Sequence, residues 1–124
     1  MSDLIFLTAT ELVHKIKNKD VSAVEVLQAH FDQIEKVNPK VNAIVTFLPE
    51  LAMDIARQVD EKVANGDELG VLEGLPIAHK DLADTKGIRT TYGSLVYENH
   101  IPVQDELIIE RLKDSGAVTL GKTN

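Results

Sequence analysis

The sequence predicts an α/β fold in which helices pack against short buried strands. Three observations predict it. Apolar residues recur at helical spacing through residues 1–66, and four-residue apolar runs follow in residues 67–124. Six of the seven glycines also fall in that second part. Helices that precede and separate short buried strands are typical of a layered α/β domain. We therefore expect a helical region over residues 1–66 and the start of an α/β core over residues 67–124.

The composition indicates a globular protein, with 44% apolar and 27% charged residues in a chain of 124. That length suffices for one modest domain or part of a larger one. The net charge of −7 argues against a broad nucleic-acid-binding surface, which needs clustered Lys and Arg. The absence of cysteine excludes disulfides, thiolate metal sites and a cysteine nucleophile. No signal peptide or membrane-spanning run is present, so we expect a cytoplasmic protein that does not enter a membrane.

Two capping boxes predict where the first two helices begin. Thr8 is followed three residues later by Glu11, and Ser22 by Glu25, each pair flanked by apolar residues at the staple positions. Lysines enrich the last turn of the first helix, where positive charge is favourable. The second helix has apolar residues at helical spacing, and we expect it to end at residues 38–39 (Asn-Pro).

A strand and a third helix complete the first half. Residues 43–47 (AIVTF) form a short strand candidate. Pro49 suits the first turn of a helix, and Gly66 suits the position just after its end.

The second half alternates strands with irregular chain. Residues 75–78 (LPIA) read as a buried strand, and residues 81–103 read as irregular. A helix follows that we expect Asp105 to cap and Gly116 to close, and residues 117–120 (AVTL) form a strand.

Residues 116–123 (GAVTLGKT) match the phosphate-binding loop pattern, but their context argues against it. Such a loop follows a strand and opens a helix, so that backbone N–H groups converge on the anion. Here the first glycine follows a helix, and the four intervening residues resemble the strand itself. We therefore reject nucleotide binding and expect Lys122 to be a structural hydrogen-bond donor.

Lys80 is the most informative residue, because it follows an apolar run and so lies at the end of a predicted core strand. A charge at that place is costly unless it is used or paired. Alone, the residue is better explained as a lysine whose amine reaches water, and only the surrounding motifs favour a catalytic role. Asp81 is either a turn or salt-bridge partner or a residue that positions the lysine loop. His79 faces the opposite side of the strand and is expected to be an ordinary packed or surface histidine without a catalytic role.

Four ordered segments resemble the amidase signature family. They are residues 74–81 (GLPIAHKD), 85–94 (TKGIRTTYGS), 110–118 (ERLKDSGAV) and 120–124 (LGKTN). Each is weak alone, but their order and spacing over about 50 residues are specific. The resemblance implies a mixed sheet wrapped by helices, of which residues 1–124 are the N-terminal portion of a single amidase domain.

The resemblance also implies a chemistry. The family uses a Ser–cis-Ser–Lys triad, and its lysine matches Lys80. A neutral Lys80, favoured by burial, would take a proton through the bridging serine and return it to the leaving amine. Gly93 and Ser94 would lie near the wall of the active site. No metal or organic cofactor is implied.

The family's two serines lie downstream of the Lys-Thr-Asn motif, where this sequence ends. Ser94 and Ser115 lack the family's Gly-Ser-Ser-Gly context. Because nucleophile and base act as a unit, we expect the 124-residue segment alone to be inactive.

Three functions remain open for the protein. The first is a free-standing amidase acting on a small carboxamide, favoured because Leu82 stands where many amidotransferase A subunits have Asn. The second is the A subunit of a tRNA-dependent amidotransferase, which uses glutamine-derived ammonia and partner subunits. The third is a non-catalytic binding or oligomerising module that associates through exposed sheet edges.

Overall fold

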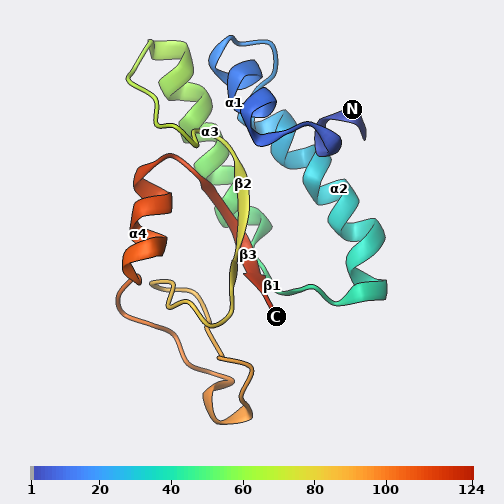
Figure 1. The fold of residues 1–124 in the computed structure, drawn as a ribbon, viewed down its shortest axis with the longest axis vertical. Coiled ribbons are helices and arrows are strands. Elements are labelled where there is room, and N and C mark those ends of the chain that lie inside the picture. Colours follow the sequence, from blue (N-terminus) through green and yellow to red (C-terminus); the bar gives the residue numbers. More distant parts are fainter. Residues whose placement is uncertain (1) are drawn as a thin grey trace.

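A computed structural model describes residues 2–124 and contains a three-stranded sheet with helices beside it (Figure 1). The predicted α/β class is confirmed. The elements are, in order, the short 3₁₀ helix η1 (Ser2–Phe6), α1 (Ala9–Lys17), α2 (Ala23–Val41), β1 (Ile44–Phe47), α3 (Pro49–Asn65), β2 (Pro76–Lys80), the 3₁₀ helix η2 (Leu95–Tyr97), α4 (Leu107–Asp114) and β3 (Val118–Thr123). Within this part of the chain, no helix has both the length and the apolar character needed to cross a bilayer.

The sheet is mixed and has the strand order β1-β3-β2. β3 is central: it pairs antiparallel with β1 and parallel with β2. The irregular segment 81–103 and helix α4 connect the two parallel strands. Parallel strands cannot be joined by a tight hairpin, so a long connection of this kind is expected. The parallel register places Lys80 opposite Thr123, so the lysine lies where β2 and β3 end together.

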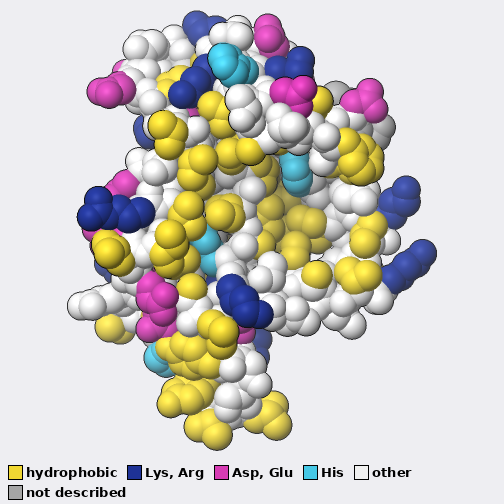
Figure 2. Space-filling model, viewed as in Figure 1, with side chains coloured by type: hydrophobic (Ala, Val, Ile, Leu, Met, Phe, Trp, Pro, Cys, Tyr) yellow, Lys and Arg dark blue, Asp and Glu magenta, His cyan; other side chains and the backbone are white. Residues whose placement is uncertain are grey.

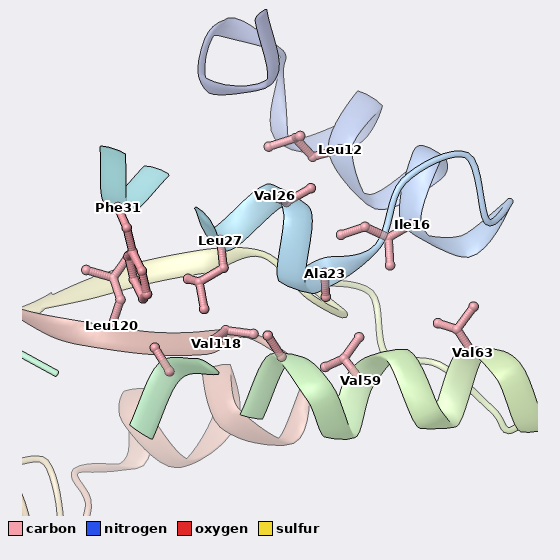
Figure 3. Packing of buried hydrophobic residues seen from close by; sticks show 12 residues of the cluster. Leu12, Ile16, Ala23, Val26, Leu27, Phe31, Val59, Val63, Val118 and Leu120 are labelled. Atoms are coloured by element: carbon pink, nitrogen blue, oxygen red, sulfur yellow. The ribbon is translucent and has the colours of Figure 1, made fainter. Parts of the chain in front are cut away.

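The hydrophobic core lies between helices α1–α3 and the sheet (Figure 3). Phe31 of α2 meets Phe47 of β1 edge to face, with ring centroids 5.1 Å apart. Small residues let α2 and α3 approach closely, since Ala23, Ala52 and Ala56 are fully buried. The buried cluster is almost entirely aliphatic: Leu12, Ile16, Ala23, Val26, Leu27, Phe31, Ala52, Ala56, Val59, Val63, Val118 and Leu120.

The predicted helix starts are confirmed. Thr8 accepts a hydrogen bond from the N–H of Glu11 at 3.2 Å, and the Glu11 carboxylate accepts from the N–H of Thr8 at 2.8 Å. Ser22 and Glu25 form the same reciprocal pair at 3.0 and 2.8 Å. Gly66 closes α3 in the left-handed conformation with φ of 72°, as expected for a glycine at that place.

The predicted end of α2 is wrong. The helix continues through Pro39 to Val41 and closes at Asn42, which is left-handed with φ of 49°. A proline in the last turn removes only one backbone donor, and the Asn42 N–H still reaches the Asn38 carbonyl at 2.7 Å. The side chain of Asn38 then bonds both the N–H and the carbonyl of Ile44, so it shapes the link to β1 instead of ending α2.

The predicted cap of α4 is also wrong. Glu106 is the N-cap residue and makes no side-chain cap. The Asp105 carboxylate instead accepts from the backbone N–H of Lys86 at 2.7 Å and from Lys113 Nζ at 2.9 Å. Burial opposes its ionisation, but these bonds outweigh burial and lower the pKa of Asp105. Asp105 therefore ties the loop after β2 to α4.

Candidate active site beside Lys80

Lys80 is the last residue of β2, and its side chain is exposed. Its Nζ donates to the main-chain oxygen of Asn124 at 2.7 Å. The sequence led us to expect that burial would favour the neutral amine of Lys80, but the buried residue at this strand end is His79. Alternation along the strand accounts for the difference, since neighbouring side chains point to opposite faces.

A pocket of about 310 Å³ opens beside Lys80. It lies between the strand ends and the loop that follows β2, and its volume is at the lower end of the range for small-molecule sites. Cationic, anionic and apolar groups share its wall: Val45, Lys80, Asp81, Leu82, Arg89, Thr91, Tyr92, Gly93 and Asn124. The pocket therefore offers polar groups for one end of a ligand and apolar surface for the rest.

Asp81 joins the end of β2 to the opposite wall of this pocket. Its side chain is only 4% exposed. One carboxylate oxygen accepts from the Thr91 N–H at 3.1 Å and from the Thr91 hydroxyl. Its main-chain carbonyl accepts from the Tyr92 N–H at 2.9 Å. Asp81 takes part in none of the ion pairs found within residues 2–124, so its contacts fit a positioning role better than a salt bridge.

Tyr92 and Gly93 form a strained corner of the pocket. Both are left-handed, with φ of 54° and 68°, an uncommon conformation for a tyrosine. The Tyr92 hydroxyl donates to the Asp84 carboxylate and lies 3.3 Å from His100 Nε2. The hydrogen bond to Asp84 raises the pKa of Tyr92 to about 12. This anchored ring thus forms a wall of the pocket that the sequence did not single out.

The two serines named from the sequence are not among the residues that line the pocket. Ser94 accepts from the Val96 N–H at 3.3 Å and caps η2. Ser115 donates to the Arg111 carbonyl at 2.8 Å at the end of α4. Of the predicted site residues, the structure brings Lys80, Asp81 and Gly93 to one pocket and leaves Ser94 outside its lining.

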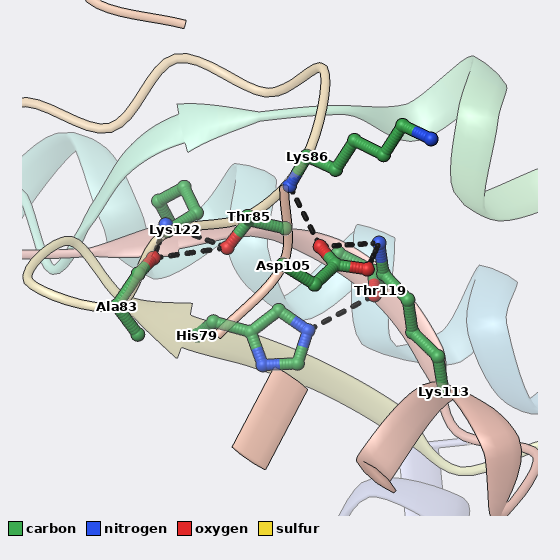
Figure 4. Close-up of polar contacts among 8 residues, drawn as sticks. All are labelled: His79, Ala83, Thr85, Lys86, Asp105, Lys113, Thr119 and Lys122. Carbon is green, nitrogen blue, oxygen red and sulfur yellow. Dashed lines mark hydrogen bonds and ion pairs between the residues drawn. The ribbon is translucent and has the colours of Figure 1, made fainter. Parts of the chain in front are cut away.

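A second lysine, Lys122 of β3, is fully buried and contacts the loop that follows β2 (Figure 4). Its Nζ donates to the Ala83 carbonyl at 2.6 Å, to Thr85 Oγ1 at 2.8 Å and to Thr90 Oγ1 at 2.9 Å. The expected role as a structural donor is confirmed, and the phosphate-loop pattern that contains it forms strand β3. Burial lowers the pKa of Lys122, against an opposing pull from Asp81.

Comparison with known proteins identifies the family. A family model described as Amidase matches residues 25–124. The chain belongs to the amidase signature family. The ordered motifs around Lys80 therefore predicted the family correctly.

Two curated relatives are similar to this chain in sequence. The A subunit of glutamyl-tRNA(Gln) amidotransferase from Carboxydothermus hydrogenoformans is 52% identical over 122 residues, which cover 98% of this chain. The protein of the same name from Streptomyces coelicolor is 47% identical over all 124 residues. In both cases the chain spans about a quarter (25%) of the relative's length.

Solved structures, amidases among them, share the fold. A fatty acid amide hydrolase superposes with a TM-score of 0.92 at 26% identity, covering 98% of this chain and 22% of the other. A bacterial aryl acylamidase of the amidase signature family gives 0.89 at 26% identity, covering 95% and 25%. A protein from a vestigial complex related to an s-triazine catabolic enzyme gives 0.90 at 31% identity, covering 95% and 26%.

Proposed function

We propose that residues 1–124 are the lysine-bearing portion of an amidase domain that breaks the C–N bond of a carboxamide. The observation that carries the proposal is the position of Lys80, at the end of a parallel strand and at the edge of a pocket of about 310 Å³. Lys80 is the general base in this proposal: it takes a proton as a serine attacks the carbonyl and returns it to the leaving nitrogen. Water then releases the acid, so amide and water become carboxylic acid and ammonia or amine.

A lysine acts as a base only when its amine is neutral, and removal from water favours that form. Lys80 is exposed in the described chain, so in this proposal desolvation comes from the bound substrate and from protein that covers the pocket. Ser94 and Ser115 are bonded elsewhere. We therefore place both serines of the mechanism outside residues 1–124, in the part of an amidase domain that corresponds to the rest of the relatives' sequences.

The two enzymatic candidates share this C–N cleavage and differ in the fate of the ammonia. A free-standing amidase releases it. In a glutamyl-tRNA(Gln) amidotransferase, glutamine supplies it and partner subunits pass it to glutamyl-tRNA. Identities of 43–52% to A subunits, against 26–28% to the solved amidases, support the second candidate. Leu82 at the pocket wall remains the feature that favours the first.

The role of Lys80 is tested in a chimera. Residues 1–124 replace the matching segment of the C. hydrogenoformans protein, and ammonia release from glutamine and from simple amides is measured. We expect Lys80→Met to lower turnover at least about a hundredfold, the usual contribution of a general base. Lys86→Met is the matched control, because Lys86 is an exposed lysine on the loop that follows β2 and lies outside the pocket lining. Retained turnover in Lys80→Met contradicts the proposed role.

The two candidates are separated by assaying the whole polypeptide that the gene encodes. Glutamine- or ammonia-dependent amidation of glutamyl-tRNA, without hydrolysis of simple amides, identifies the amidotransferase component. Hydrolysis of simple amides without any tRNA requirement identifies the free-standing amidase.

A further inference from the structure

The direction of the Lys122 side chain is set by an irregularity in the sheet. Leu120 packs in the core with Phe31, and strict alternation would point Lys122 to that same face. The register between β2 and β3 shifts by one residue after Ile77, and such a shift moves the following side chains to the opposite face. Gly121 lies at this shift, where a Cβ would overlap the Thr46 carbonyl oxygen of β1. Lys122 therefore points away from the core formed with α1–α3 and toward the loop that follows β2.

The contacts of Lys122 account for every hydrogen that its ammonium group can donate. An ammonium has three N–H donors, and burial of any one without an acceptor is costly. The three acceptors are neutral oxygens of one loop, those of Ala83, Thr85 and Thr90. None of the ion pairs in the described chain involves Lys122. The buried Lys122 ammonium thus holds residues 83–90 together through three hydrogen bonds.

The loop of residues 83–90 leads directly into residues that line the pocket. Thr90 is held by Lys122, and the next residue, Thr91, donates twice to the Asp81 carboxylate. The Tyr92 N–H then donates to the Asp81 carbonyl, and the Ala83 N–H donates to the Lys80 carbonyl at 2.9 Å. The Lys80 carbonyl thus accepts from Ala83, which Lys122 holds, and Asp81 accepts from Thr91, the neighbour of Thr90, which Lys122 also holds.

We propose that Lys122 is a positioning residue for Lys80: its ammonium fixes the loop that places Asp81, Thr91 and Tyr92 around the pocket. The consequence for turnover rests on the proposed function, whereas the ordering of the loop does not. The two parts are therefore measured separately.

The ordering of the loop is measured by amide hydrogen exchange on the 124-residue chain. The reporters are the N–H groups of Ile88, Thr90 and Tyr92, which donate to Thr85, His100 and Asp81. We expect Lys122→Met to speed their exchange at least tenfold relative to the amides of α3, and the exposed control Lys86→Met to change nothing. An equal increase at all amides, or none at the reporters, overturns the proposal.

A chemical rescue keeps the test decisive if Lys122→Met fails to fold. The chain has no cysteine, so Lys122→Cys provides one alkylation site in the unfolded chain. Bromoethylamine restores an ammonium at the length of lysine, whereas 1-iodopropane gives the same length without charge. We expect only the aminoethylated protein to refold with slow exchange at the three reporters. Equal behaviour of the two alkylated proteins overturns the proposal.

The catalytic consequence is measured in the chimera, where we expect Lys122→Met to lower kcat at least tenfold. If Lys80→Met abolishes turnover while Lys122→Met leaves kcat unchanged, the positioning role is wrong and the proposed function stands. If Lys80→Met retains turnover, the proposed function fails, and the exchange measurement still decides whether Lys122 holds the loop.

Discussion

At the scale of single residues, neighbours on β2 have opposite surroundings. Lys80 borders the pocket, whereas His79 is 4% exposed and lies 3.0 Å from the Thr119 hydroxyl (Figure 4). Burial lowers the pKa of His79 to about 4, and the ammonium groups of Lys122 and Lys113 add to this effect against Asp105. His79 is therefore a neutral core histidine at physiological pH. Its protonation affects the free energy of unfolding.

The first prediction concerns acid stability. Between pH 6.5 and about 4, the unfolded chain protonates His79 while the folded chain does not. The free energy of unfolding therefore falls as the pH drops through that window, by on the order of 3 kcal/mol for this residue. His79→Gln keeps a partner for Thr119 and removes the titration. Urea unfolding at pH 7 and pH 4 should show a smaller loss for the variant; equal losses would contradict the assignment.

At the scale of elements, α2 is capped twice at its N-terminus. Ser22 and Glu25 cap it locally, and Asp60 of α3 accepts from the N–H groups of Ala23 at 2.7 Å and Val24 at 3.2 Å. A carboxylate at this end also interacts favourably with the helix dipole. Asp60 thus fixes how α3 lies against α2, beneath the sheet that carries Lys80.

We predict that Asp60→Ala lowers the free energy of unfolding by about 1–2 kcal/mol, the usual range for a lost helix cap. The matched control is Asp54→Ala on the same helix, whose carboxylate pairs with Arg57 at 2.9 Å while both side chains are more than 60% exposed. Exposed pairs of this kind contribute about 0–1 kcal/mol. Chemical denaturation of both variants measures the difference, and similar losses in the two would argue against the cap.

Helix α2 illustrates what the sequence could predict. Its capping box lies within four consecutive residues, so the local sequence pattern was enough to locate the start of the helix. Asp60 is 36 and 37 residues away from the donors it satisfies, and no spacing rule connects them. The candidate site divides in the same way. The ordered motifs indicated Lys80, Asp81 and Gly93, whereas Thr85 and Thr90 meet Lys122 only because a register shift turns that lysine toward their loop.

At the scale of the whole molecule, apolar side chains collect on the surface of residues 95–108. Figure 2 shows apolar side chains gathered at the lower end of the molecule, where this segment projects beyond the sheet in Figure 1. On α4 only Ile109 is buried. Large exposed apolar surfaces mark contacts with other protein. The residues concerned are Leu95, Val96, Tyr97, Ile101, Val103, Leu107 and Ile108.

We predict that the 124-residue chain self-associates through this segment. The sequence favoured the sheet edges instead, and β1 and β2 each have one unpaired side in the observed sheet. The double variant Val96→Asp, Val103→Asp places charges on side chains that are 85% and 82% exposed, so the fold should tolerate it. Sedimentation equilibrium should give a lower average mass for this variant than for the wild type. Val71→Asp, 74% exposed in the connection before β2, is the control. A wild-type chain that stays monomeric contradicts association altogether, whereas unchanged association of the double variant assigns it to the strand edges.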